Sequence, residues 1–123
     1  MSYAQRAVVA VTTDADGDAT EYSAPLNGIL SAIAYVKTDF ADGVDFTITT
    51  EDSGQTLWTE ANVDAAAVRA PRQPTHAGDG TPSLFAAEGE PVEAPIVLAD
   101  ERVKIVVAQG GATASGAFHI IVC

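Results

Sequence analysis

The stretch Asp45–Glu51 has the sequence DFTITTE, in which polar and apolar side chains alternate. Phe46 and Ile48 fall on one side of an extended chain, and aspartate, threonine and glutamate side chains fall on the other. Successive side chains of a β-strand point to opposite faces of its sheet. The stretch therefore predicts a half-buried antiparallel strand with Phe46 and Ile48 facing the core.

The same two-residue period recurs towards the C-terminus, where two further strands are expected. Gly28–Lys37 differs because it carries apolar residues on both faces, which is typical of a central strand covered on both sides. The side chains expected to face inward in the two C-terminal strands are Val103, Ile105 and Val107, and Phe118, Ile120 and Val122.

Turn signals separate these runs at regular intervals. Asp16-Gly17 lies between two β-prone stretches, Ala7–Thr13 and Ala19–Ser23, and predicts a hairpin because Asp-Gly tolerates the positive φ angles of a type I′ turn. The run Glu60–Val68 (EANVDAAAV) is the one stretch with helical composition. Short strands between regular turns indicate an all-β fold, an antiparallel β-sandwich or jelly roll, in a single domain spanning residues 1–123.

The charge and cysteine content exclude several classes of function. Seventeen Asp and Glu residues against six Lys and Arg residues give a formal charge of −11, which repels phosphate backbones and anionic lipid headgroups. Nucleic acid and membranes are therefore not expected as partners. The single cysteine, Cys123, excludes an internal disulfide and a cysteine-built zinc site. The apolar runs are too short for a secretory signal or for the ~20 residues of a membrane span, so synthesis in a cytoplasm is expected.

One long excursion interrupts the strand pattern. Ala70–Pro95 contains five of the six prolines, and proline cannot donate a hydrogen bond to a central strand pair. Arg69 and Arg72 lie at its start, and Leu84 and Phe85 form an apolar island within it. Two interpretations remain open: Leu84 and Phe85 plug the edge of the core, or the loop docks on a neighbouring subunit. Under the second, these four residues are the candidate contacts to a shell or subunit.

The acidic string around Asp14, Asp16 and Asp18 suggests calcium at first, because hard cations prefer carboxylate oxygens. The EF-hand pattern then fails, since Ala19 stands where the loop needs glycine and Pro25 stands where it needs glutamate. A solvated turn is the better interpretation. No metal site is predicted.

The sequence also shows no pattern that is typical of a catalytic nucleophile or a general base. His76 and His119 have no neighbours that suggest a metal or acid–base site, and Ser115 lies outside a nucleophile elbow. No neighbour of Cys123 would lower its pKa into a nucleophilic range. We therefore expect no catalytic residue and no cofactor, and the protein is not predicted to be an enzyme.

The order of several motifs resembles small proteins encoded among the structural genes of tailed bacteriophages, and the resemblance spans nearly the whole chain. It implies a virion component, most specifically a head decoration (cement) protein, and identifies no binding residues. The motifs are Thr12-Thr13-Asp14, Gly28–Tyr35, Asp45–Glu51, Arg69–Arg72, Thr75-His76, Ala99–Gly111 and Gly116–His119.

The resemblance implies that the major capsid protein and other copies of this chain are its partners, as a homo-oligomer on the shell of the virion. Contact is expected through Ala70–Pro95, through an N-terminal segment Met1–Arg6, or through both. Two alternatives stay open. One is a tail, connector or fibre-associated virion protein, and the other is a carbohydrate-binding β-sandwich that uses Trp58 and Tyr35 as a stacking platform.

Overall fold

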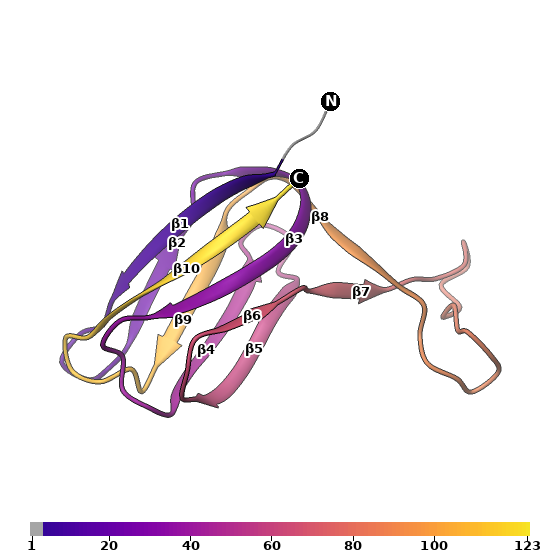
Figure 1. The fold of residues 1–123 in the computed structure, drawn as a ribbon. Coiled ribbons are helices and arrows are strands. Elements are labelled where there is room, and N and C mark those ends of the chain that lie inside the picture. Colours follow the sequence, from indigo (N-terminus) through magenta and orange to yellow (C-terminus); the bar gives the residue numbers. More distant parts are fainter. Residues whose placement is uncertain (1–3) are drawn as a thin grey trace.

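The computed structural model describes residues 4–123, and in that range the chain forms strands and no helix (Figure 1). No helix that could cross a membrane is therefore found in this range. The strands are β1 (Gln5–Thr12), β2 (Ala19–Tyr22), β3 (Leu26–Lys37), β4 (Val44–Thr50), β5 (Thr56–Val63), β6 (Ala67–Arg69), β7 (Arg72–Pro74), β8 (Glu93–Glu101), β9 (Val103–Ala108) and β10 (Ser115–Val122).

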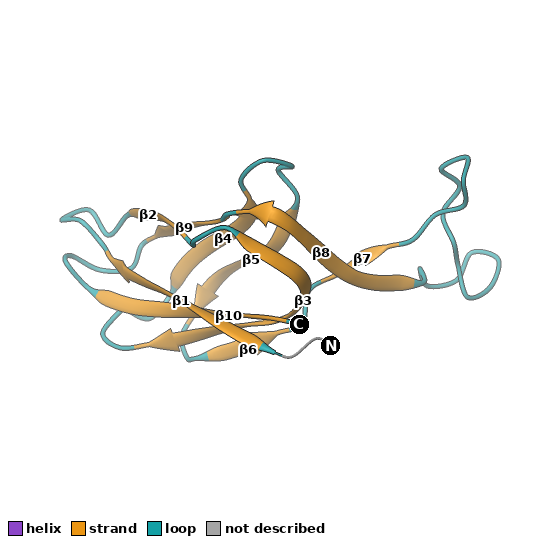
Figure 2. Cartoon of the chain, turned by 90° about the horizontal axis from the view of Figure 1, so that it is seen from above, coloured by secondary structure: helices purple, strands orange, loops and turns teal. Residues whose placement is uncertain are grey.

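The strands form two antiparallel sheets that pack face to face (Figure 2). The six-stranded sheet has the order β1-β10-β3-β8-β7. The short strand β6 pairs with the same edge of β3 as β8 does, but at residues 33–35, further along the strand. The four-stranded sheet has the order β2-β9-β4-β5. This arrangement confirms the predicted β-sandwich.

The stretch Asp45–Glu51 lies in β4 except for its last residue, and its alternation is confirmed. Phe46 and Ile48 are buried, whereas Thr47 is exposed on the outer face opposite Thr59 of β5. The expected inward residues of β9 and β10 are buried as well, each with at most 2% of its surface exposed. Alternation alone therefore located the inner faces of three strands correctly.

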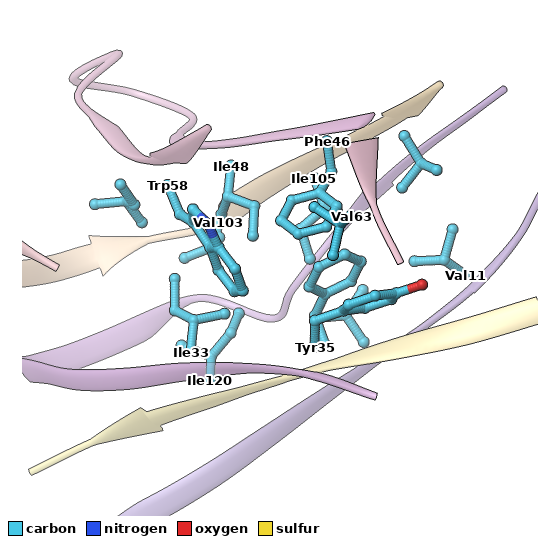
Figure 3. Packing of buried hydrophobic residues seen from close by; sticks show 14 of the residues in the cluster. Val11, Ile33, Tyr35, Phe46, Ile48, Trp58, Val63, Val103, Ile105 and Ile120 are labelled. Atoms are coloured by element: carbon cyan, nitrogen blue, oxygen red, sulfur yellow. The ribbon is translucent and has the colours of Figure 1, made fainter. Parts of the chain in front are cut away.

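Aromatic rings fill the centre of the sandwich, where side chains from the two sheets meet (Figure 3). Tyr35 of β3 and Phe118 of β10 come from the six-stranded sheet, and their ring centroids lie 5.2 Å apart. Phe46 of β4 meets Phe118 edge-on at 5.0 Å and Trp58 of β5 at 4.8 Å. Such offset and edge-to-face pairs suit the aromatic quadrupole. They join the two sheets into one core.

The predicted hairpin at Asp16-Gly17 is wrong, although the turn exists. Gly17 has φ +85°, as Asp-Gly predicted, but β1 pairs with β10 and β2 pairs with β9, so the turn crosses from one sheet to the other. The crossing is held by a hydrogen bond from Gly110 N to Gly17 O at 2.9 Å. A Cβ on Gly17 would lie 3.1 Å from Gly111 N, so this close approach also favours glycine.

Two further expectations are corrected. Glu60–Val68 is not helical, because β5 continues to Val63, whose burial against the core and pairing with Val44 outweigh the helix propensity of alanine. β3 is central, as expected, but it is not covered on both faces. Ile29 and Val36 on its outer side are 45% and 40% exposed.

Candidate docking arm

The residues 72–95, called the arm below, project from the end of the sandwich as an ordered ribbon (Figures 1 and 2). At its root β7 pairs with β8, so that Arg72 lies opposite Pro95 and Pro74 opposite Glu93. Gln73 fastens the root to the turn between β4 and β5, because its Oε1 accepts a hydrogen bond from Gln55 Nε2 at 2.9 Å. The long excursion expected from the prolines is therefore present, but it leaves the sandwich instead of crossing its surface.

Beyond the root, backbone hydrogen bonds continue to hold the arm. Thr75 N donates to Val92 O at 2.8 Å, Ser83 N donates to Thr75 O at 2.9 Å, and Val92 N donates to Ser83 O at 2.8 Å. The ribbon branches at these three residues into two tight turns. These backbone groups are therefore paired within the arm, which gives the ribbon a defined path beyond its root.

The first turn spans residues 76–82. Ala77 N donates to Thr81 O at 2.9 Å, and Gly80 adopts φ +89° at the corner. Asp79 Oδ1 accepts a hydrogen bond from Thr81 N at 3.0 Å, and the backbone and hydroxyl of Thr81 hold the pKa of Asp79 below its usual range. This tip therefore carries a fixed negative charge at neutral pH.

The second turn spans residues 84–91 and carries the apolar island. Phe85 N donates to Glu90 O at 3.0 Å, and Gly89 N donates to Ala86 O at 2.8 Å. Leu84 is 41% exposed and Phe85 is 76% exposed. The interpretation that these two residues plug the edge of the core is therefore wrong. They form an apolar knob at the far end of the arm.

The two candidate arginines lie near the root of the arm in different surroundings. The Arg69 guanidinium donates to both carboxylate oxygens of Glu60, at 3.1 and 3.0 Å, and lies 5.4 Å from the centre of the Trp58 ring. It thus ties β6 to β5. Arg72 lines a small hollow of about 160 Å³ between β3 and the root, together with Ile29, Leu30, Ser31, Ala70, Pro71 and Pro95. The structure does not bring Leu84 or Phe85 to either arginine.

The proposed sugar platform is excluded for Tyr35 and Trp58, because they are 1% and 5% exposed and belong to the core. Burial and the nearby Asp42 raise the pKa of Tyr35 to about 12, so its hydroxyl stays protonated. A phenol that is neither accessible nor easily ionised offers no stacking surface and no base.

The polar residues considered from the sequence lie at separate places within residues 4–123. No three His, Cys, Asp or Glu side chains in this range are placed to share a metal ion. His119 accepts a hydrogen bond at Nδ1 from Arg6 at 2.8 Å, and Cys123 shares one with Ser31 at 3.1 Å. Of the N-terminal segment, Met1–Tyr3 lies outside the described residues, and Gln5 and Arg6 belong to β1.

No protein-family model matches the chain, and no curated protein matches it. Among solved structures, it is similar to a chain in the structure of the infectious bursal disease virus Gt strain, with 12% identity and a TM-score of 0.34 over 98% of this chain. A chain of the Gx strain has 14% identity and a TM-score of 0.29 over 96%. This protein spans 32% of the length of either viral chain. Both of these structures are of a virus.

Proposed function

We propose that this protein is a non-enzymatic structural component of a virus particle, and that it decorates the assembled head of a tailed bacteriophage. In this role it works by contact: the β-sandwich is a rigid body, and the arm reaches a neighbouring subunit on the shell. The phage assignment draws on the motifs that resemble phage structural proteins, and the mode of contact draws on the arm.

The arm carries the proposal. An exposed phenylalanine normally gains by burial, yet Phe85 is held 76% exposed at the end of a ribbon whose backbone is paired. A knob with this construction suits a pocket or surface on another molecule. Aromatic anchors of this kind supply much of the binding energy at protein interfaces.

Repetition strengthens such a contact. A decoration protein binds many equivalent sites, so a modest contact per copy gains avidity when neighbouring copies are linked. A formal charge of −11 on each copy would keep densely decorated particles apart in solution. Neither property needs a catalytic group.

The direct test is binding of the purified protein to empty phage shells. We expect saturable binding with a stoichiometry that follows the symmetry of the shell, and particles that lack the protein should assemble but lose DNA more readily on heating. A copy number of only a few per particle would instead indicate a tail, connector or fibre position. Failure of the wild-type protein to bind shells would overturn the decoration role.

The arm is tested by Leu84→Asp and Phe85→Asp, after thermal melting has shown that both variants fold. Each should lower occupancy on the shell. Val106→Asp is a matched control, because Val106 is an exposed valine on the outer face of the four-stranded sheet, away from the arm. Full occupancy by both arm variants would remove the arm from the interface.

A further inference from the structure

The outer face of the six-stranded sheet is unusual for so acidic a protein. Ten outward side chains on β1, β10, β3 and β6, called the sheet face below, stand in three rows across the strands. The strand registers place them as Ala10, Ala117 and Val36; Val8, His119, Ala34 and Val68; and Arg6, Ile121 and Ala32.

The composition of the sheet face differs sharply from that of the whole chain. Eight of its ten residues are alanine, valine or isoleucine, the other two are Arg6 and His119, and none is a carboxylate. Val8, Val36 and Val68 are 57%, 40% and 62% exposed. An apolar surface of this kind, continuous across four strands, is typical of a surface that is covered in the functional assembly.

The outer face of the other sheet shows what a solvated face of this protein looks like. There Thr47 of β4 lies between Thr59 of β5 and Val106 of β9, and Thr20 of β2 lies beyond Val106. Lys104 and Tyr22 pair in the same face. The other outer face carries threonines and a lysine beside its exposed apolar residues Val106 and Tyr22, so the sheet face is the more apolar of the two.

The charges of the two surfaces indicate that the arm of another copy covers the sheet face. Residues 73–93 of the arm contain four acids, Asp79, Glu88, Glu90 and Glu93, and no lysine or arginine. The sheet face offers a guanidinium from Arg6 and no acid, so the arm and the sheet face are complementary in charge. They are also complementary in character, because the knob of Leu84 and Phe85 is apolar.

The arm of a molecule does not lie on its own sheet face. Its root is fixed to β8 and to Gln55, and the paired ribbon carries the knob outward beyond the end of the sandwich (Figures 1 and 2). The knob and the sheet face of one chain are therefore both left open. Two copies, each with a charge of −11, approach most easily where carboxylates do not oppose each other.

We infer that the arm of one copy docks on the sheet face of a second copy, with Leu84 and Phe85 packed on its alanines and valines and with Glu88 or Glu90 close to Arg6. The inference rests on the proposed function for its place on the particle, whereas the contact itself exists in solution. Because two different surfaces meet, the contact is heterologous and links copies into a ring or an open chain.

The test measures self-association by sedimentation equilibrium over a range of protein concentrations. Wild-type protein should associate. Phe85→Asp replaces the aromatic side chain of the knob with an acid, and Val8→Glu places an acid on the sheet face. Each should weaken association roughly thirtyfold or more, as loss of an interface anchor does. Val106→Glu, on the opposite face, should associate like wild type. Ala34→Glu is a second sheet-face variant in case Val8→Glu does not fold.

Mixing decides between head-to-tail and face-to-face contact. Phe85→Asp keeps an intact sheet face and Val8→Glu keeps an intact arm, so an equal mixture should form heterodimers and stop at two chains. A wild-type monomer at all concentrations, association by Phe85→Asp alone, or a mixture that stays monomeric would overturn the inference. Association without shell binding would overturn only the proposed function, and shell binding by a monomer would overturn only this contact.

Discussion

At the scale of single residues, Phe118 is the side chain on which the core depends most visibly. It has no exposed surface, its ring lies against Tyr35, and Phe46 meets it edge-on from the other sheet. Replacing it with alanine removes both contacts and leaves a cavity between the sheets. We expect Phe118→Ala to lower the free energy of unfolding by about 3–5 kcal/mol in chemical denaturation.

The matched control for this substitution is Val106→Ala, which trims an exposed side chain on the outer face. It should change the free energy of unfolding by no more than about 0.5 kcal/mol. Equal effects of the two substitutions would mean that Phe118 does not face the core.

Glu101 makes the stability of the protein depend on pH. Its Oε1 accepts hydrogen bonds from Ser53 N at 2.6 Å and Ser53 Oγ at 2.9 Å, and these hold the pKa of the carboxyl below its usual range. The unfolded chain therefore takes up the proton first as pH falls, so the stabilisation is present above the ordinary glutamate pKa and is lost as pH falls through the folded one.

We expect Glu101→Gln to melt at a lower temperature than wild type at neutral pH, because the glutamine oxygen is a weaker, uncharged acceptor for Ser53. The difference in Tm should shrink as the pH falls below the ordinary glutamate pKa and then through the lower folded value. A difference that stays constant down to strongly acid pH would show that the charge of Glu101 is not what Ser53 stabilises.

At the scale of elements, hydrogen bonds to Asp14 hold the turn after β1. Asp14 Oδ1 accepts hydrogen bonds from Asp16 N at 2.9 Å and Asp18 N at 3.0 Å, and an asparagine oxygen can accept the same two. The triple change of Asp14, Asp16 and Asp18 to asparagine should therefore leave the fold intact. Calcium at roughly millimolar concentration should not raise the Tm of wild type, and a rise of several degrees would contradict this account.

The arm contributes nothing to the core, since the buried core residues of the described chain pass from Val63 directly to Ile96. Joining Pro74 to Glu93 through Asn-Gly keeps the β7–β8 pairing and removes residues 75–92. We expect the Tm to change by less than the roughly 4 °C that corresponds to about 1 kcal/mol in a domain of this size. Failure of the shortened protein to fold would show that the arm supports the sandwich.

At the scale of the whole molecule, the sequence predicted what is local and missed what depends on distant partners. Alternation located the inner faces of β4, β9 and β10, and the prolines located the arm. The Asp16-Gly17 turn was predicted as a hairpin because its strands are adjacent in the sequence. Their actual partners, β10 and β9, lie more than 80 residues away along the chain, where a local pattern carries no information.

The sheet face was missed for the same reason. On β1 alone, Arg6, Val8 and Ala10 look like an ordinary mixed outer edge. Only the register that sets Val8 beside His119 and Ala34 shows that apolar residues continue across the sheet. Exposure of Phe85 was equally beyond the sequence, because an apolar pair in a loop packs inward or outward with the same local pattern.

The way the arm is built also makes it a scaffold for carrying foreign peptides. Its shape depends on backbone hydrogen bonds and on the positive φ of Gly80, whereas a side chain added at Gly78 would meet nothing within 4 Å. A peptide spliced into the first turn would thus leave both the sandwich and the second turn, with Phe85, as they are. If copies assemble side by side, such a splice would present the inserted epitope as a dense, evenly spaced array.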